Sequence, residues 1–226
     1  FGFDSPPAML QGRNLQPRQD GLEFDAEVDG RKHHVELQLP GRHNALNALA
    51  ALAAVHAAGI SLSEAAAALA RFAGLKRRLE TIGVARGVTV IDDFAHNPDK
   101  IAATLETLVA GPGRLLIMFQ PHGYGPLAKM GQELAQTFAE GMREGDRLFL
   151  PDPVYQGGTV DKSRGSDWLA DAIRQAGGHA EHIAERRAIE ERLLSEALPG
   201  DRIAILGARD DTLSEFAAEL VERLGT

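Results

Sequence analysis

The residues best suited to chemistry lie together at positions 87–100, GVTVIDDFAHNPDK. Two carboxylates (Asp92 and Asp93), a histidine (His96) and an asparagine (Asn97) follow one another closely there. A loop needs one acid for solubility and not such a cluster, which therefore indicates a ligand-binding site. Taken singly, Asp93 could merely form the turn and Asn97 could merely cap a helix, so that alternative stays open.

A buried strand and the helix after it must position this cluster. Val88, Val90 and Ile91 make a short apolar run of β-branched residues, which is typical of a strand buried on both faces. Asn97 suits a helix cap, and Pro98 suits the first helical position. Apolar residues then recur at helical spacing until Gly111, namely Ile101, Leu105 and Leu108. The cluster thus lies on a strand-to-helix turn, where open parallel sheets bind their ligands.

The N-terminal part of the chain predicts a hairpin followed by two helices. Residues 1–19 are rich in Pro, Gly and polar residues and indicate loop, with at most one short strand. Alternating apolar residues at 22–28 and 35–39 flank Asp29-Gly30, a strong hairpin-turn signal, and Pro40-Gly41 closes the hairpin. Residues 43–59 are almost all Ala and Leu, which predicts a buried helix beginning at His43 or Asn44.

The second helix is expected to begin with a capping box formed by Ser61 and Glu64 and to run through Phe72 to Gly74. The basic triplet at 76–78 follows directly, and we place a domain boundary after it, giving domains at 1–78 and 79–226. Such a charge run is usually a solvated linker. The position of this one, shortly before Asp92 and Asp93, favours a functional role instead.

From residue 79 onward strands alternate with helices, which indicates βαβ units and a mostly parallel sheet with right-handed crossovers. We expect strands at 115–119, 148–150 and 203–206 and helices at 127–142, 168–176 (capped by Ser166), 188–197 and 213–224. The predicted fold class is therefore α/β, a Rossmann-like mostly parallel sheet flanked by helices and preceded by the hairpin and its two helices. Polar residues follow the strands, namely Asp92, Asp93, 120–122, Asp152 and 209–211. They share one edge of the sheet, although loops of any α/β protein gather there.

Composition narrows the classes of function. The chain has 226 residues and a formal charge of −8, which argues against a nucleic-acid or anionic-membrane surface. It has no cysteine and no apolar run of membrane-spanning length, so the cytoplasm is the simplest compartment. Residues 157–163 superficially resemble a phosphate loop, but Asp161 replaces the glycine before the lysine. His33 and His34 are better explained as surface residues of a polar strand than as metal ligands.

Three ordered segments resemble motifs of the Mur ligases. Residues 41–51 look like the G-x-H-N-x-x-N-x-x-A-A signature, residues 72–80 are similar to F-x-G-x-x-x-R-x-E, and residues 91–98 resemble D-D-[YF]-A-H-x-P. Residues 119–122, FQPH, resemble the muramate–alanine ligase branch, and the DDFAH form is shared with the muramyl-tripeptide ligase branch. The resemblance covers essentially the whole chain, as the end of the central ATPase domain plus a C-terminal domain.

The resemblance implies an ATP-dependent ligase of peptidoglycan synthesis or recycling. ATP would phosphorylate a carboxylate of a UDP-N-acetylmuramyl precursor, and an amino acid or peptide amine would attack the acyl phosphate. The residues implied for ATP are Asn44, Asn47 (adenine), Arg78 (ribose and phosphates) and Asp93 (ribose hydroxyls). Those implied for the amine substrate are His96, Asn97, His122, Arg209 and Asp210.

The resemblance also implies that some of the family's functional groups are not in this chain. The family's phosphate loop, Mg²⁺ ligands and modified lysine would precede Phe1, so no catalytic or metal-binding residue is assigned within the chain, and the chain alone is expected to be inactive. Residues 123–126, GYGP, stand where the alanine-adding branch has arginines, which leaves the identity of the amine open. The alternatives are a folylpolyglutamate- or cyanophycin-type ligase, or a non-catalytic nucleotide-binding module. A truncated first domain would also expose apolar surface and favour self-association.

Overall fold

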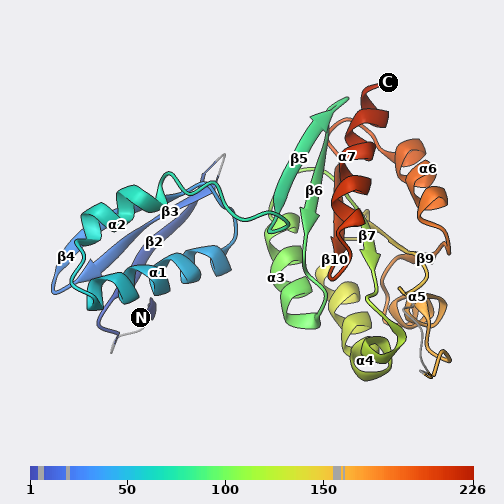
Figure 1. Cartoon of the computed structure of the whole chain (residues 1–226), viewed down its shortest axis with the longest axis horizontal. Coiled ribbons are helices and arrows are strands. Elements are labelled where there is room, and N and C mark those ends of the chain that lie inside the picture. Colours follow the sequence, from blue (N-terminus) through green and yellow to red (C-terminus); the bar gives the residue numbers. More distant parts are fainter. Residues whose placement is uncertain (5–7, 19–20, 155–158, 160) are drawn as a thin grey trace. The chain divides into compact units, whose positions relative to one another are not determined.

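The computed structural model describes the whole chain except residues 5–7, 19–20, 155–158 and 160 (Figure 1). The chain divides by its contacts into two compact units, Phe1–Leu75 and Lys76–Thr226. The division falls after Leu75, whereas the boundary expected from the sequence lies after residue 78. In the described part of the chain, no helix combines the length and the apolar character needed to cross a membrane.

The first unit is a four-stranded sheet covered by two helices. Its strands are β1 (Gly2–Phe3), β2 (Gln11–Arg18), β3 (Gly21–Val28) and β4 (Arg31–Leu37), in that spatial order. Helices α1 (Arg42–Ala57) and α2 (Leu62–Leu69) contact the sheet and each other, and they enclose a core around Phe24, Val35 and Leu49. The apolar face of α1 is therefore covered by the unit's own sheet, so this helix does not supply the exposed apolar surface expected of a truncated first domain.

The expected hairpin is confirmed, and the expected loop before it is not. Asp29 and Gly30 have φ of 49° and 74°, and Val28 pairs with Arg31, so the turn is of the two-residue type whose backbone twist suits a hairpin. Strand β2 was missed because it carries Gly12, Asn14 and Pro17, which disfavour strands. Pro17 is tolerated because β1 pairs only with the first two residues of β2, which leaves Pro17 on a free edge.

Three details of the helices differ from the expectation. The α1 helix is buried on one face only, through Ala45, Ala48, Leu49 and Leu52. Ser61 is the N-cap of α2, but its side chain makes no capping hydrogen bond. The α2 helix ends at Leu69 and does not reach Gly74; just beyond its end, the carbonyl of Ala70 accepts a hydrogen bond from the Gln38 side chain at 2.8 Å. Phe72 consequently lies outside the helix.

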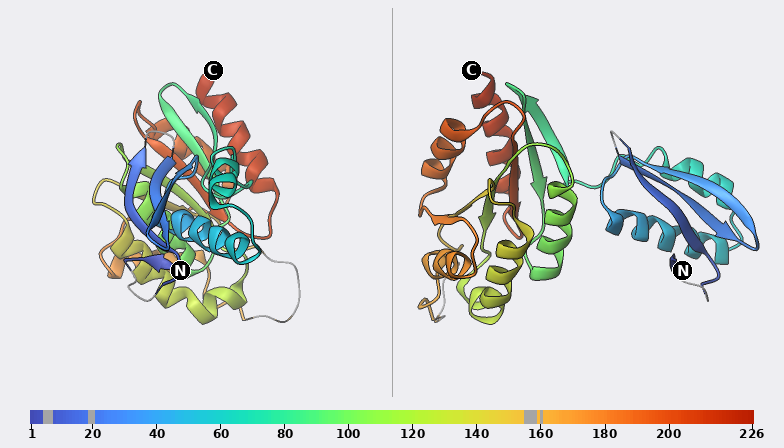
Figure 2. Two further views of the ribbon diagram at one scale, coloured as in Figure 1. Left: turned by 90° about the vertical axis from the view of Figure 1, so that its left-hand side faces the viewer. Right: turned by 180° about the vertical axis from the view of Figure 1, so that it is seen from behind.

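The second unit is a six-stranded sheet with helices on both faces (Figure 2). The spatial order is β5 (Glu80–Ala85), β6 (Val88–Asp93), β10 (Arg202–Gly207), β7 (Leu115–Gln120), β8 (Arg147–Leu150) and β9 (Ala180–His182). All pairs are parallel except β5 with β6, so the expectation of a mostly parallel sheet is confirmed. Strand β9 was not expected, because its sequence Ala-Glu-His is short and has no apolar run.

The helices divide between the two faces of this sheet. Helices α3 (Pro98–Val109), α4 (Tyr124–Gly141) and α5 (Ser166–Gln175) share one core with Ile117 and Phe119. Helices α6 (Arg186–Glu196) and α7 (Thr212–Gly225) share another with Val90 and Ile205. The cap of α5 is Gly165 and not Ser166, whose hydroxyl donates to the carbonyl of Pro151 instead.

Candidate functional site

The carboxyl ends of the central strands lie side by side, as the polar residues after them predict. Leu206 pairs with both Asp93 and Phe119, and Gly207 pairs with Gln120. The helix after β10 covers one face of the sheet, and the helices after β6 and β7 cover the other. The chain thus continues from β10 to one face of the sheet and from its neighbours β6 and β7 to the other face. Such a divergence opens a crevice at this edge, and open parallel sheets bind their ligands there.

The adjacent carboxylates Asp92 and Asp93 point to opposite faces of the sheet, as strand alternation requires. An oxygen of Asp92 accepts from the Ser214 hydroxyl of α7 at 2.6 Å, and an oxygen of Asp93 accepts from the Thr104 hydroxyl of α3 at 3.1 Å. Both aspartates are buried, with 0% and 5% of their surface exposed. The two residues therefore have different partners and different roles.

Asp93 holds the turns on either side of it. Its Oδ1 accepts from the Ala95 N–H at 2.8 Å as well as from Thr104, and its Oδ2 accepts from the Leu79 N–H at 2.7 Å. Each carboxylate oxygen can accept two hydrogen bonds, so Oδ2 keeps room for one more donor. The turn-forming role that the sequence left open is thus present, and an additional ligand contact is compatible with it.

Arg77, which the sequence did not single out, joins the ends of β6 and β10. Its guanidinium lies 3.2 Å from the Asp92 carboxylate and donates to the carbonyls of Gly207 at 2.9 Å and Asp210 at 3.1 Å. Burial raises the pKa of the Asp92 carboxyl above its usual value, while the Ser214 hydrogen bond and the Arg77 charge act in the opposite direction. Arg77 compensates a carboxylate that would otherwise be buried without a counter-charge.

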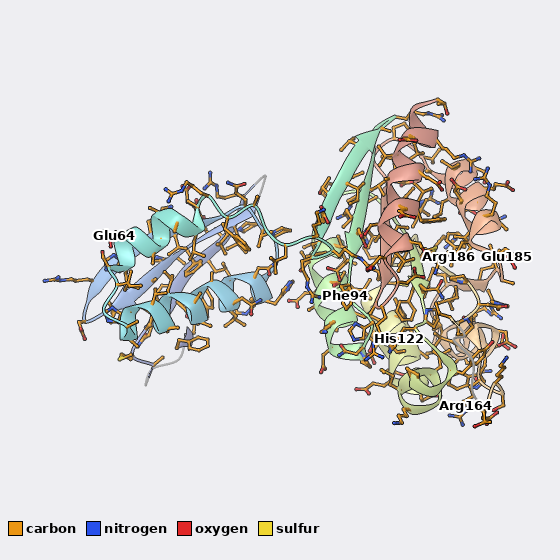
Figure 3. The ribbon with its side chains drawn as sticks, in the orientation of Figure 1. Glu64, Phe94, His122, Arg164, Glu185 and Arg186 are labelled. Carbon is orange, nitrogen blue, oxygen red and sulfur yellow. The ribbon has the colours of Figure 1, made fainter. Side chains whose placement is uncertain are left out.

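The neighbouring Arg78 is exposed. Its guanidinium carbon lies 5.3 Å from the centre of the Phe94 ring, and that of Arg77 lies 5.0 Å from the same ring. Phe94, labelled in Figure 3, belongs to the segment that leads from β6 to α3. An aromatic ring attracts a cation on its face, so Phe94 is a platform for Arg78.

Two histidines meet where β6 and β7 end. The rings of His96 and His122 are 5.2 Å apart and nearly perpendicular, and His96 Nδ1 lies 2.8 Å from the carbonyl of Phe94. Both border a hollow too narrow to admit a water molecule, whose other residues, Phe119 and Leu134 among them, are mostly apolar. Burial, together with the positive charges of His96 and Arg209, holds the pKa of His122 below its usual value of 6.5. His122 is therefore a neutral imidazole at pH 7.

Asp210 is already engaged by neighbouring side chains. It forms an ion pair with Arg186, the first residue of α6, and accepts from the Thr212 hydroxyl at 2.6 Å. Burial alone would raise the pKa of Asp210, but the hydrogen bonds from Thr212 and Arg186 hold it below its usual value. Arg186, labelled in Figure 3, also donates to the Gln120 side chain at 2.8 Å and so ties the end of β7 to the loop after β10. No spacing or motif around Arg186 pointed to this role.

The other expected site residues have simpler surroundings. Asn97 caps α3 by accepting from the Lys100 N–H at 3.0 Å, and Arg209 is exposed with φ of 60°. In the first unit, Asn44 donates to the Pro40 carbonyl at 2.7 Å, while Asn47 is exposed on α1. The structure brings Asp93, His96, His122, Arg209 and Asp210 to one edge of the second unit, and it places the two asparagines of α1 in the first.

Two further candidates stay outside the site. His34 lies with Glu23 and Glu36 in an exposed cluster whose ligand atoms are within 4.8 Å of one another. Arg18 already occupies that cluster, with its guanidinium 2.9 Å from Glu36, which supports the surface interpretation. Within the rejected phosphate-loop stretch, residues 157, 158 and 160 lie outside the described part of the chain.

Comparisons with known proteins decide the family. Residues 77–209 match the profile described as "Mur ligase, glutamate ligase domain", and residues 1–55 match the "Mur ligase middle domain". The chain belongs to the Mur ligase family. The family resemblance expected from the three motifs is therefore confirmed.

The relatives within the family are ligases of peptidoglycan precursors. The UDP-N-acetylmuramate–L-alanine ligase of Streptomyces avermitilis is 36% identical over 216 residues, which are 93% of this chain and 45% of that protein. The enzyme of the same name from Paracoccus denitrificans is 32% identical and is matched by 99% of this chain and 48% of its own length. The chain spans about half the length of the curated Mur ligases it matches.

Solved Mur ligases share the fold. UDP-N-acetylmuramate–alanine ligase MurC from Thermotoga maritima aligns with 98% of this chain and 47% of its own, at a TM-score of 0.76 and 23% identity. The murein peptide ligase Mpl from Psychrobacter arcticus aligns with 100% of this chain and 46% of its own, at a TM-score of 0.65 and 25% identity. The α/β fold expected from the sequence is confirmed.

Proposed function

We propose that the chain is the part of an ATP-dependent carboxylate–amine ligase that contacts the nucleotide and receives the amine substrate. Its acceptor is a UDP-N-acetylmuramyl precursor of peptidoglycan, handled in the cytoplasm. The observation that carries this proposal is the similarity of 93% of the chain to a UDP-N-acetylmuramate–L-alanine ligase, at 36% identity.

The residues proposed for the nucleotide suit the chemistry of ATP. Arg78 offers an exposed guanidinium for phosphate or ribose, and Asp93 keeps one acceptor direction on Oδ2 for a ribose hydroxyl. Asn47 offers an exposed carboxamide, the group that reads a base edge, and Asn44 lies one turn before it on α1. Mg²⁺ fits the second unit less well, because the carboxylates of Asp92 and Asp93 are buried and hydrogen-bonded. We expect the Mg²⁺ ligands, like the phosphate loop, in the rest of the protein.

The residues proposed for the amine substrate surround the histidine pair. Arg209 supplies a positive charge for a carboxylate of the incoming amino acid or peptide, and the neutral His122 can accept a proton from its ammonium group. Asp210, fixed by Arg186, would orient the loop that carries Arg209. His96 stacks against His122, and Asn97 fixes the start of the neighbouring helix. The chemistry is positioning of the amine beside an acyl phosphate.

The full-length protein that contains this chain should release ADP only when both the muramyl precursor and an amine are present. L-Alanine and L-alanyl peptides are the first amines to test, with product mass as the readout. Turnover on a folylpolyglutamate or cyanophycin acceptor instead would favour the other ligases of the superfamily. ATP binding without turnover on any acceptor would favour the non-catalytic nucleotide-binding module.

A further inference from the structure

The segment Arg77-Arg78-Leu79 has an unusual backbone. Arg77 and Leu79 have φ of 57° and 50°, a left-handed conformation that costs free energy for any residue with a Cβ. Both residues are buried, whereas Arg78 between them is exposed. Strain of this kind persists only where the surroundings over-determine it, and it is concentrated at functional sites. The two strained residues together present Arg78 to solvent.

Hydrogen bonds hold this turn against the end of β6 from both sides. The Arg77 carbonyl accepts from the Phe94 N–H at 2.8 Å, and the Leu79 N–H donates to Asp93 at 2.7 Å. The Arg77 N–H donates to the Glu80 side chain at 2.7 Å. The Arg77 side chain, only 10% exposed, adds the contacts with Asp92, β10 and the loop after it. The backbone of Arg78 is thus fixed from both neighbours.

A purely structural account explains Arg77 but not Arg78. The Arg77 guanidinium has a buried counter-charge and two carbonyl partners. Arg78 has no ion pair with the residues that the structure describes, and it lies over the ring of Phe94, which it shares with Arg77. Two guanidinium groups on one ring repel each other. That arrangement leaves the Arg78 charge uncompensated and available to an anion.

We propose that Arg77 is a positioning residue for nucleotide binding: it fixes the backbone of Arg78 beside Phe94, so that the Arg78 guanidinium already lies over the ring before the nucleotide arrives. The inference rests on the proposed function, which assigns Arg78 to ATP. Pre-organisation of this kind lowers the entropy lost on binding, so it contributes to affinity without any contact between Arg77 and the ligand. Arg77 acts through Arg78 and has no effect of its own on the nucleotide.

A double-mutant cycle tests this in the full-length protein, with the dissociation constant of ATP measured by calorimetry. Arg78→Ala should weaken ATP binding about tenfold to a hundredfold. Arg77→Lys keeps the charge but loses the planar fork of donors, and it should weaken binding about tenfold. In the Arg78→Ala background, the same Arg77→Lys change should alter affinity less than about twofold, because the guanidinium that Arg77 positions is gone. Arg86→Lys is the matched control, since Arg86 is also left-handed, with φ of 50°, and is exposed on the turn between β5 and β6.

The outcomes separate the two claims. If Arg78→Ala leaves ATP affinity unchanged, the proposed nucleotide role of Arg78 is wrong. If Arg78→Ala weakens binding but Arg77→Lys has no effect, or the same effect in both backgrounds, only the positioning role is wrong. If Arg77→Lys does not fold, Glu80→Met loosens the same turn by removing the acceptor of the Arg77 N–H. It should weaken ATP binding about threefold in the native background only, and an equal loss in both backgrounds overturns the inference.

Discussion

Replacing Asp93 with Asn should destabilise the second unit strongly, whatever its effect on ATP. The carboxylate accepts hydrogen bonds from Leu79, Ala95 and Thr104. In the variant, the amide NH₂ must face either the Leu79 N–H or the Ala95 N–H, and an unsatisfied buried N–H costs about 1–3 kcal/mol. The remaining bonds change from charge-assisted to neutral, which costs about 1 kcal/mol more. We therefore expect a loss of about 2–4 kcal/mol in the free energy of unfolding, or about 4–16 °C in Tm.

Trp168, the one tryptophan in the sequence, makes this measurable in the second unit alone. It lies on α5 and packs against the core that α3 and α4 share. Urea unfolding followed by its fluorescence should show the full loss for Asp93→Asn. Thr104→Val, which removes a single hydrogen bond, should lose only about 1 kcal/mol. If Asp93→Asn is no less stable than Thr104→Val, the reasoning from the three hydrogen bonds is refuted.

The same pair of variants isolates the ribose contact. If Asp93 accepts from a ribose hydroxyl, Asp93→Asn should lower apparent ATP affinity by about tenfold to a hundredfold. Thr104→Val loosens the same carboxylate without removing its charge and should keep ATP affinity. Asp92→Asn should not change a direct ribose contact, because Asp92 points to the opposite face. Equal losses of affinity in Asp93→Asn and Thr104→Val would show that the effect is structural.

Three further predictions concern pH, backbone conformation and activity. The pKa of His122 lies below 6.5 in the folded protein, so the unfolded chain binds more protons than the folded one just below pH 6.5, and the free energy of unfolding falls as the pH falls through that range. In acid-unfolding measurements, His122→Asn should make the free energy of unfolding depend less on pH there. An unchanged dependence would contradict this. In thermal melts, Gly113→Ala should destabilise the second unit markedly, since φ is 78° and a Cβ would lie 1.8 Å from the Gly200 carbonyl oxygen. A Cβ at Gly145 would meet nothing within 4 Å, so Gly145→Ala should be neutral or stabilising by about 0.5 kcal/mol. The 226-residue chain alone should release no phosphate from ATP, because its sequence lacks a complete phosphate loop; turnover above the blank would contradict this.

Self-association of the chain remains a prediction, but it now depends on exposed apolar residues outside the covered face of α1. The apolar face of α1 is covered by its own sheet, but Leu46, Ile60, Phe72 and Leu75 of the first unit are exposed. Sedimentation over a range of concentrations should show association through these exposed apolar side chains. A monomer at every concentration, with little binding of a hydrophobic dye, would contradict it.

Short motifs in the sequence correctly predicted those features of the structure that depend on residues close to one another in the chain. Asp29-Gly30 formed the expected turn because the pair needs no distant partner, and Asn97 with Pro98 began α3 for the same reason. Asp92 and Asp93 were recognised because strand alternation and the following helix fix where they lie. In each case, the interactions that determine the structure are between residues close in sequence.

The features that the sequence did not reveal depend on contacts between distant residues. Arg77 donates to a carbonyl 130 residues away, and Arg186 donates to a side chain 66 residues away. A basic triplet does not show which of its members will be buried, because that depends on the strand that arrives last, β10. The sequence allowed a turn-forming role for Asp93, but it did not show that the carboxylate also accepts from Leu79, in the preceding turn, and from Thr104, on the next helix.

We have proposed that this chain belongs to an ATP-dependent ligase that joins an amine to a muramyl carboxylate. The most direct measurement is ADP release by the full-length protein with UDP-N-acetylmuramate and each candidate amine, with mass spectrometry of the product. We predict ADP release that requires both substrates, a product heavier by the amine minus water, and a KM for ATP raised about tenfold or more in Arg78→Ala. ADP release without either substrate, or no amide product with any amine, would contradict the account.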